Sequence, residues 1–413
     1  MRTRWIRVLF QPFLLCLLLS RMLFAGATEE WPQYRGVNRD GVSAEKGVLT
    51  SWPQAGPKAL WRTAVGDGYS GIAVARGRVF TMDARDQDEF IVCMDAASGK
   101  EVWRVRIDST FMNDQGNGPR STPTVDGNLT FALSGQGTLY AAQAGDGKKV
   151  WSHNLVNEYA TKIPNWGFSS SPLVEGDLLI LPAGSGNSNA VLAFDKKTGA
   201  LIWKSQTDEP GYSSPIAITV NGIRQIIVLS GTMLFSLSPA DGKLYWKYPW
   251  KTDYFVNAAV PIFIAPDKIF ISTGYSSGAA LLRINASKTG VTVQELWLSK
   301  GLKNHFNSSV LHAGHIYGFD NAILKCIDAA TGEEKWKKSG FGKGSLLLAD
   351  GHLLVLSERG LLVLVEATPS EYKEKASAEV LKGKCWTMPT LAGGKLYLRN
   401  QKELVCLDVT GKV

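Results

Sequence analysis

The stretch Ile327-Asp328-Ala329-Ala330-Thr331-Gly332-Glu333-Glu334-Lys335-Trp336 decides the fold, because versions of it recur along the chain. The segments 94–103 and 194–203 follow the same pattern, and 143–151 and 238–246 keep the glycine four residues before the tryptophan. In this phrase the aspartate can bond the backbone of its own turn, the glycine can adopt a positive φ, and the tryptophan caps the outer strand. The phrase therefore predicts a hairpin.

The tryptophans that close such phrases recur at intervals of about 40 to 50 residues. They are Trp61, Trp103, Trp151, Trp203, Trp246, Trp297 and Trp336. Short alternating runs separated by turn residues lie upstream of each phrase, such as 124–128 followed by 129–133. Each repeat therefore supplies about four strands, which is the size of one propeller blade.

The repeats predict a single all-β domain, an eight-bladed β-propeller of four-stranded antiparallel blades, with seven blades as the alternative. The expected blades are 70–104, 121–152, 171–204, 214–247, 257–298, 307–337 and 344–381, with an eighth starting at Trp386. That last blade lacks an outer strand, and the strand at 58–61 is left over at the other end of the chain. We expect these two ends to join and close the ring. The run 371–381 is the one short helix that the pattern allows.

The N-terminus has the layout of a secretory signal peptide. Arg2, Arg4 and Arg7 precede an apolar run at 8–19, and Ala25-Gly26-Ala27 resembles a cleavage signature. Because the apolar run is short for a membrane span, a retained anchor is the alternative rather than the first choice. We expect a signal peptide at 1–27, a lead-in segment at 28–57 and the propeller at 58–413, in a protein exported to the periplasm or cell envelope, or secreted.

The charge of the chain does not indicate a nucleic-acid partner. The formal charge of +8 includes four arginines in 1–27, and their removal leaves 41 Lys and Arg against 37 Asp and Glu. No basic cluster interleaved with aromatic residues lies along one stretch, as binding to nucleic acid would require. We expect a monomer that binds no nucleic acid and that associates with the cell envelope.

Three cysteines share one position of the repeat. Cys93, Cys326 and Cys406 fall where other copies carry Ala141 and Ala193. This pattern favours a small, buried packing site, and disulfides are the alternative in an exported protein.

The Asp-Ala-x-Thr-Gly phrase with its closing Trp336 resembles the repeat of pyrroloquinoline quinone (PQQ) propellers and of the outer-membrane assembly propeller BamB. The resemblance covers nearly all of the chain after 1–27 and extends to Trp31-Pro32-Gln33-Tyr34-Arg35-Gly36. It implies a propeller fold, and it implies either a binding role for a protein partner or the chemistry of a quinoprotein dehydrogenase. The chain departs from the alcohol-oxidising members, because it has no adjacent Cys-Cys pair and no Cys-x-x-Cys-His haem site.

In a propeller, the loop before each innermost strand and the middle hairpin of each blade open on one face as a funnel. The positions before the innermost strands are Tyr69, Arg120, Trp166, Phe168, Ser169, Tyr212, Asn257, His305, Asn307, Lys343 and Trp386. The hairpin positions are Asp83, Asp86, Asp320, Asn321, Glu358, Arg359, Arg399 and Asn400.

These positions give candidate sites of three kinds. Aromatic rings with Arg120 and Lys343 suit a planar anionic ligand such as PQQ, although rim charge or strand capping is an alternative for the two cations. We take Tyr69, Arg120, Trp166, Tyr212, Asn307, Lys343 and Trp386 as the candidate cofactor-binding residues. Asp320, Asn321 and Glu358 offer oxygen ligands for Ca²⁺, and turn chemistry is the alternative. His305 is the candidate for acid–base work, with a channel-lining role as its alternative.

Three hypotheses about function follow. The first is a non-catalytic extracytoplasmic propeller that presents its funnel to a protein partner or small ligand. The second is an oxidoreductase that binds PQQ and Ca²⁺ and oxidises an alcohol or sugar. The third is a carbohydrate- or polymer-binding module, because sugars also stack on aromatic rings at a rigid rim.

Overall fold

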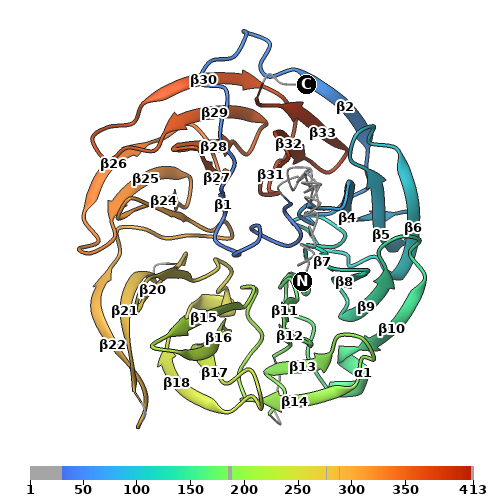
Figure 1. The fold of residues 1–413 in the computed structure, drawn as a ribbon, viewed down its shortest axis with the longest axis vertical. Helices are drawn as coiled ribbons and strands as arrows, with labels where there is room; N and C mark the ends of the chain where they lie inside the picture. Colours follow the sequence, from blue (N-terminus) through green and yellow to red (C-terminus); the bar gives the residue numbers. More distant parts are fainter. Residues whose placement is uncertain (1–29, 185–187, 276, 288, 411–413) are drawn as a thin grey trace, which may run out of the picture.

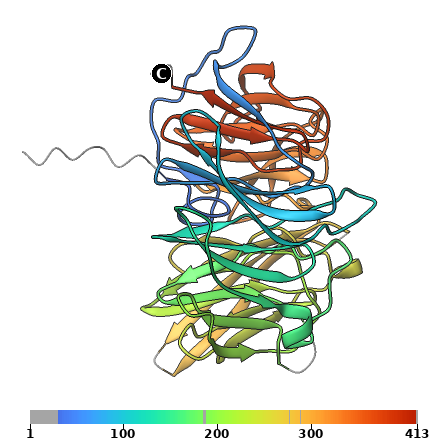
Figure 2. The same cartoon turned by 90° about the vertical axis from the view of Figure 1, so that its right-hand side faces the viewer.

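The computed structural model describes residues 30–184, 188–275, 277–287 and 289–410, so the signal peptide expected at 1–27 lies outside the described residues. The described chain forms eight sheets arranged as a ring around a central axis (Figure 1). Seen from the side, the ring is a thick disc (Figure 2). The predicted eight-bladed propeller is confirmed.

The first four blades follow one another along the chain with the innermost strand first. They are β3 (Ala73–Ala75), β4 (Arg78–Arg85), β5 (Asp88–Asp95), β6 (Glu101–Ser109); β7 (Thr124–Asp126), β8 (Leu129–Leu133), β9 (Thr138–Gln143), β10 (Lys149–Asn154); β11 (Leu173–Glu175), β12 (Leu178–Pro182), β13 (Val191–Asp195), β14 (Leu201–Ser205); and β15 (Ile216–Val220), β16 (Ile223–Leu229), β17 (Met233–Leu237), β18 (Leu244–Pro249).

The next three blades repeat this order, and the eighth is completed from the other end of the chain. They are β19 (Ile262–Ile264), β20 (Lys268–Thr273), β21 (Gly278–Ser287), β22 (Gly290–Ser299); β23 (Val310–His312), β24 (His315–Asp320), β25 (Ile323–Asp328), β26 (Glu334–Lys338); β27 (Ser345–Ala349), β28 (His352–Leu356), β29 (Leu361–Glu366), β30 (Glu374–Glu379); and β31 (Thr390–Ala392), β32 (Lys395–Arg399), β33 (Glu403–Asp408), with β2 (Ala59–Ala64) outermost.

The ring closes as the sequence predicts, because β2 pairs antiparallel with β33 and becomes the outer strand of the eighth blade. Arg62 and Glu403, which are 341 residues apart in the chain, form an ion pair of 3.0 Å across this pairing.

The repeat phrase joins one blade to the next. The indole Nε1 of Trp103 donates to the carbonyl of Ala144 in the following blade at 3.1 Å, and Trp61, Trp151, Trp203, Trp297 and Trp336 donate in the same way. The repeat glycine of the following blade faces the ring. Gly147 has φ +76, and a Cβ on it would lie 2.8 Å from the Trp103 ring. The glycine is therefore needed both for its backbone conformation and for the close approach of the tryptophan.

Two seams depart from this rule, because the outer strand β30 of the seventh blade carries no tryptophan and Trp246 has a different partner. Trp246 donates to Oε1 of Gln225 within its own blade at 3.0 Å, because the next blade has the long β21–β22 hairpin in place of the Asp-to-Trp phrase.

Small residues lie opposite the repeat tryptophans. Cys93 pairs with Trp103, Cys326 with Trp336 and Cys406 with Trp61 across adjacent strands. All three thiols are buried and free, as the alignment of the repeats predicts. Burial raises the pKa of Cys93 to about 12, so its thiol stays protonated at neutral pH.

Hydroxyl groups link the innermost strands around the channel. The backbone N–H of Gly71 donates to Thr122 Oγ1 at 3.1 Å, that of Thr122 to Ser171 Oγ at 2.9 Å, and that of Ser171 to Ser214 Oγ at 2.9 Å. Each bond crosses from one blade to the next. Backbone N–H groups at the inner edges of the blades therefore have acceptors without the addition of another strand.

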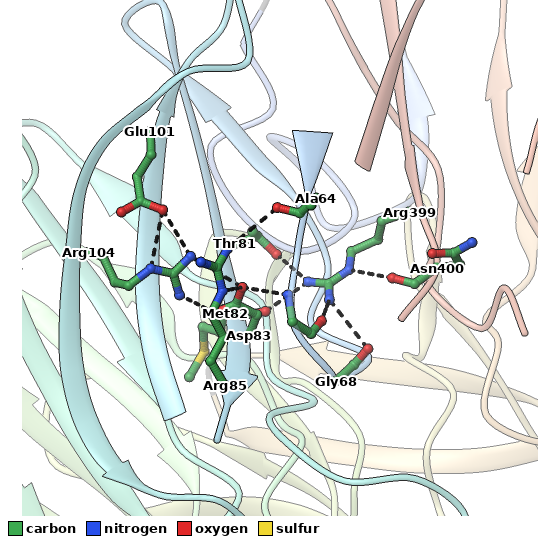
Figure 3. Close-up of polar contacts among 11 residues, drawn as sticks. Ala64, Gly68, Thr81, Met82, Asp83, Arg85, Glu101, Arg104, Arg399 and Asn400 are labelled. Atoms are coloured by element: carbon green, nitrogen blue, oxygen red, sulfur yellow. Dashed lines mark hydrogen bonds and ion pairs between the residues drawn. The ribbon is translucent and has the colours of Figure 1, made fainter. Parts of the chain in front are cut away.

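A buried guanidinium fastens the eighth blade to the first (Figure 3). Arg399 on β32 donates to the carbonyl of Met82 at 2.8 Å, to Thr81 Oγ1 at 2.9 Å and to the carbonyl of Gly66 at 3.2 Å. Asp83, on the same strand β4, accepts from the backbone of Gly66 and pairs with Arg104 and Arg85. Burial lowers the pKa of Arg399 to about 10, which leaves it charged at neutral pH.

The lead-in segment crosses one end of the channel, and its strand β1 (Val42–Ser43) pairs parallel with β27 (Figure 1). Trp31 exchanges backbone hydrogen bonds with Val74 of the first blade. The buried Arg35 donates to the carbonyls of Asp40 and Ser309, both at 2.6 Å. Arg39, also buried, donates to the carbonyls of Ser171 and Pro172. The segment therefore bonds to the first, third, sixth and seventh blades and forms a floor.

The helix expected at 371–381 is wrong. Residues Glu374–Glu379 form β30, the outer strand of the seventh blade, because the propeller requires a fourth strand there. Helical structure occurs instead at α1 (Leu155–Tyr159), capped by the side chain of Asn154, and in the short η1 (Asp253–Phe255). Within the part of the chain that the structure describes, no helix has the length and apolarity to cross a membrane.

Candidate functional site

The channel holds a cavity of about 580 Å³ whose wall comes from residues of all the blades. It contains most of the residues predicted to precede the innermost strands: Tyr69, Arg120, Trp166, Ser169, Tyr212, His305, Asn307, Lys343 and Trp386. Tyr34 of the lead-in segment also lines the cavity. Because that segment forms the floor of the channel, the cavity is a funnel open toward the loops that precede the innermost strands.

Eight aromatic rings follow one another around the mouth of this funnel, and we call them the collar. In order they are Tyr69, Trp386, Phe306, His305, Tyr275, Tyr254, Trp166 and Tyr212, counting His305 as an aromatic ring. Neighbouring centroids along the chain of contacts are between 4.9 and 6.4 Å apart, from Phe306–Trp386 to Trp166–Tyr254. The collar therefore offers a nearly continuous aromatic surface built on loops of six blades.

Cationic groups lie on the collar. The guanidinium of Arg120 is 5.6 Å from the ring centroid of Tyr69 and 5.0 Å from that of Phe111. The Arg120 guanidinium also donates to the carbonyls of Gly116 and Gly118, so it holds the rim loop as well as lining the funnel. The ammonium of Lys343 lies 5.8 Å from the centroid of Trp386, and that of Lys384 lies 4.2 Å from it.

His305 is the candidate acid–base residue, and its surroundings keep it neutral. Burial, followed by the nearby charge of Lys343, lowers the pKa of His305 to about 4. Its ring stacks on Tyr275 at 5.1 Å, and its Nδ1 is buried without a hydrogen-bond partner among the described residues. At neutral pH the imidazole is therefore uncharged, and its Nδ1 lacks a partner but has almost no accessible surface.

Two collar phenols also stay protonated. Burial raises the pKa of both Tyr69 and Tyr212 to about 12. Their hydroxyl groups are therefore donors at neutral pH, and Tyr69 donates to the carbonyl of Gln115 on the rim loop.

A buried carboxyl supports the rim from below. Glu89 on β5 accepts from the backbone N–H of Phe111 at 3.0 Å and from that of Gly135 at 2.9 Å. Burial is the main cause that raises the pKa of Glu89 to about 7, against the lowering effect of these two bonds and of Arg120. The loop that carries Arg120 therefore rests on a group that titrates near neutral pH.

The three candidate metal ligands do not come together. Asp320 pairs with Lys325 at 2.8 Å and with Lys303 at 3.2 Å. Glu358 accepts from the Trp386 indole at 2.9 Å and from the backbone of Lys343 at 3.2 Å. Asn321 is exposed and lines a neighbouring hollow. Among the residues that the structure describes, no three His, Cys, Asp or Glu side chains are grouped to hold a metal, so this donor set does not fit a calcium cage.

The other hairpin positions do not line the cavity. Asp83 and Arg399 are buried in the seam between the eighth and first blades. Asp86 and Arg359 are exposed, and Asn400 accepts backbone hydrogen bonds from Lys402 and Glu403 in its own turn. Two positions before innermost strands are also structural, because Asn257 donates to three carbonyls and Phe168 packs in the core.

Sequence reasoning missed several residues of the funnel. Tyr275 lies just after β20, in the middle hairpin of the fifth blade, where no hairpin position was assigned although the same rule would find it. Phe306 lies between His305 and Asn307, so the position rule reached its loop without selecting it. Tyr254 has no repeat signal, because it lies in η1, between the fourth and fifth blades. Tyr34 could be placed only by knowing that the lead-in segment folds across the channel.

Comparison with known proteins agrees with this geometry. The model of the family described as "Outer membrane protein assembly factor BamB" matches residues 45–217, 158–338 and 320–413. The BamB of Yersinia pestis is 22% identical over 390 residues, which is 88% of this chain and 93% of that protein. The BamB of Shewanella oneidensis is 28% identical over 199 residues, which is 46% of this chain and 45% of that protein.

Solved structures share the fold. BamB from Moraxella catarrhalis superposes with a TM-score of 0.61 at 15% identity, over 86% of this chain and 99% of that one. The quinohemoprotein alcohol dehydrogenase of Comamonas testosteroni gives 0.51 at 12% identity, over 94% of this chain and 82% of that one. At these identities the likeness extends to the fold alone. The family match covers nearly all of the chain that follows the lead-in segment, and the chain therefore belongs to the BamB-like family of PQQ-repeat β-propellers.

Proposed function

We propose that this propeller is an extracytoplasmic binding module that takes its ligand or partner segment in the collared funnel. The observation that carries the proposal is the collar itself, eight rings brought together from loops of six blades around one cavity. Aromatic rings at a rigid rim bury much ligand surface at a small cost in conformational entropy.

The collar rings are not part of the repeated tryptophan contact that joins the blades. Trp166 and Trp386 lie outside the repeat phrase, and both are only partly buried. The cavity volume falls in the range of small-molecule sites, where a few polar groups among apolar and aromatic walls set the orientation of a ligand. The same mouth suits an inserted side chain or loop of a protein partner, and several relatives bear the name of an outer membrane protein assembly factor.

Export is part of the proposal. The basic start, short apolar run and small-residue signature in 1–27 support removal of a signal peptide, followed by action in the periplasm or cell envelope.

Quinone chemistry is not part of it. The funnel has cations and rings that suit a planar anion, but the candidate oxygen ligands Asp320 and Glu358 are already paired with lysines or with an indole and a backbone N–H.

The proposal is tested by measuring which molecules of the cell envelope the immobilised protein retains. The mature protein is immobilised, exposed to fractionated envelope extract of its own source, washed and denatured, and the released molecules are identified by mass spectrometry. A matched column carries Trp386→Ala, which alters the collar, and another carries Arg359→Ala, which alters an exposed residue that does not line the cavity.

We expect the native protein and Arg359→Ala to retain the same molecule and Trp386→Ala to lose it. Equal retention by all three columns, or the absence of any selectively retained molecule, contradicts the funnel as the binding surface. A parallel titration with PQQ and Ca²⁺ should give no rise in melting temperature. A rise that is lost in Arg120→Ala or Lys343→Ala would instead favour the oxidoreductase.

A further inference from the structure

A second hollow opens beside the funnel, and its wall is basic. It has a volume of about 470 Å³ and is lined by Tyr275, Lys300, Lys303, His305, Asn321 and Lys343. Three of these residues, Tyr275, His305 and Lys343, also line the funnel, so the two hollows adjoin along them. We call this second space the lysine hollow.

The charge in the two hollows is strongly one-sided. The lysine hollow contains three lysines and no carboxylate, and the funnel adds Arg120 against a single acid, Asp114. Lys303 is partly neutralised, because it pairs with Asp320, which itself pairs with Lys325. Among the described residues, neither Lys300 nor Lys343 has a carboxylate within ion-pair distance. Two ammonium groups therefore face an adjoining cavity without an ionic partner, which favours an anionic group there.

Neutral donors stand beside these lysines. His305 lines this hollow and is uncharged at neutral pH, so its ring does not repel a neighbouring ligand or add to the positive charge. The exposed Asn321 also lines the hollow and carries a side-chain amide. An oxyanion in this position would meet both point charges and hydrogen-bond donors, and several donors on one anion give specificity as well as affinity.

The collar next to the lysine hollow does not form a slot for one flat ring system. The plane of Trp386 is inclined by 32° to that of Tyr69 and by 48° to that of Phe306, and Phe306 is inclined by 78° to His305. His305 and Tyr275 are nearly parallel, at 29°, but the other rings of this part of the collar are turned from their neighbours. Several separate ring faces of this kind suit a chain of puckered rings better than a planar tricycle. Amides and hydroxyls on the funnel wall, such as Asn113, Gln115 and Ser169, can pair with ring hydroxyls.

We propose that the funnel and the lysine hollow together bind an acidic oligosaccharide, with its sugar rings on the collar and a carboxylate or sulfate between Lys300 and Lys343. This inference rests on the proposed function of the funnel and gives the chemical class of its ligand. A neutral oligosaccharide would leave the two ammonium groups without a partner and would bind more weakly.

Calorimetric titration tests the inference with four disaccharides of the same linkage: one neutral, one with a uronate, one with a sulfate and one with both. We expect the doubly acidic sugar to bind and the neutral sugar to bind at least about tenfold more weakly, as the loss of one charged hydrogen bond predicts. Higher ionic strength should weaken the acidic sugars and leave the neutral one unchanged. The uronate and sulfate arms identify which anionic group the hollow prefers.

Lysine variants test where the anionic group of the sugar binds. Lys343→Gln should weaken binding of the doubly acidic sugar about tenfold, since its ammonium is half-buried. Lys300→Gln should weaken it about threefold, because that side chain is exposed. Lys204→Gln, an exposed lysine on the outer strand β14, serves as the matched control and should change nothing. Thermal melting of each variant shows that the fold is retained.

His305 supplies a readout independent of affinity. A bound anion beside it stabilises the protonated ring, so the pKa of His305, now lowered by burial and by Lys343, should rise in an NMR titration of the complex. The rise should be absent with the neutral sugar.

Equal affinity for neutral and acidic sugars, or full affinity in Lys343→Gln, overturns the anionic subsite while leaving binding in the funnel intact. If no sugar binds, or an acidic peptide binds in their place, the saccharide class is wrong. The envelope-retention experiment then judges the proposed function separately, because it assumes no ligand class.

Discussion

The seams between blades and the mouth of the funnel are built from the same residue types, yet those residues have different neighbours. In a seam, Trp103 gives its indole N–H to a carbonyl of the next blade and covers a glycine. At the mouth, Trp386 lies against two other rings and two lysines and gives its indole N–H to a carboxylate. The cations differ in the same way, since Arg35 is surrounded by carbonyls and Lys343 by ring faces.

This difference separates residues that hold the ring from residues available to a ligand. A side chain whose donors all bond to the backbone of another blade contributes to stability and has no free hydrogen-bond donor for a ligand. A side chain that lies on a cavity with a charge or ring face open can gain a partner. Substitutions in the two regions should therefore affect different measurements.

Trp103→Ala should have the largest effect on folding. Removal of a buried tryptophan from a seam costs about 4 kcal/mol of the free energy of unfolding, and urea unfolding followed by fluorescence measures it. Binding in the funnel should not change in the folded fraction. A cost below about 1 kcal/mol would mean that the seam tryptophans are dispensable, and would remove the distinction between seam and mouth.

Arg35→Met tests the floor of the channel. The change keeps the apolar stem but leaves the carbonyls of Asp40 and Ser309 without their donor, and should cost about 3 kcal/mol in urea unfolding. Arg359→Met, at an exposed hairpin, is the control and should stay within about 0.5 kcal/mol of the native protein. Similar values for both variants would show that the floor is not fixed by this guanidinium.

Glu89→Gln tests the support of the rim and depends on pH. Because burial raises the pKa of the folded Glu89 to about 7, above its ordinary value of 4.5, the folded state holds its proton more tightly than the unfolded state. The protonated carboxyl therefore makes its whole contribution to stability below pH 4.5. This contribution is lost as the pH rises to about 7 and the group ionises.

When the pH is raised from 5 to 8, the free energy of unfolding of Glu89→Gln should increase by about 2 kcal/mol relative to that of the native protein. Urea unfolding at the two pH values measures the difference. A difference between the two proteins that is independent of pH would show that Glu89 does not titrate in this range.

Trp386→Ala should have the smallest effect on folding and a large one on binding. This ring is only partly buried, and its loss should cost about 1 kcal/mol in urea unfolding. The same variant should lose the molecule that the native protein retains. A folding cost as large as that of Trp103→Ala would place Trp386 with the seam residues.

Most seams could be predicted from the sequence because six of the eight repeat the same contact. Glycine at φ near +70 beneath a tryptophan leaves a pattern that recurs, and the pattern gave the number of blades and the closing strand. The mouth of the funnel was predictable in part. Tyr69, Lys343 and Trp386 come just before innermost strands, and this position places them at the cavity.

The rest depends on contacts without a sequence pattern. Arg399 and Asn257 occupy the predicted positions, but they bond to backbone carbonyls, which every residue carries, and they are therefore buried. The path of the lead-in segment across the channel is set by the same kind of contact. Tyr254 lies in η1, between two blades, where the repeat has no matching position, so no comparison between repeats could point to it.

The pairing of β2 with β33 also fixes the order in which the molecule can fold. These strands are so far apart in the chain that residues 403–408 emerge from the ribosome only after seven blades have been made. Until then β2 has no strand to pair with, and the first and seventh blades each lack the neighbour that the eighth blade provides. Ring closure is therefore a late and slow step, during which open sheet edges need protection from pairing with other chains.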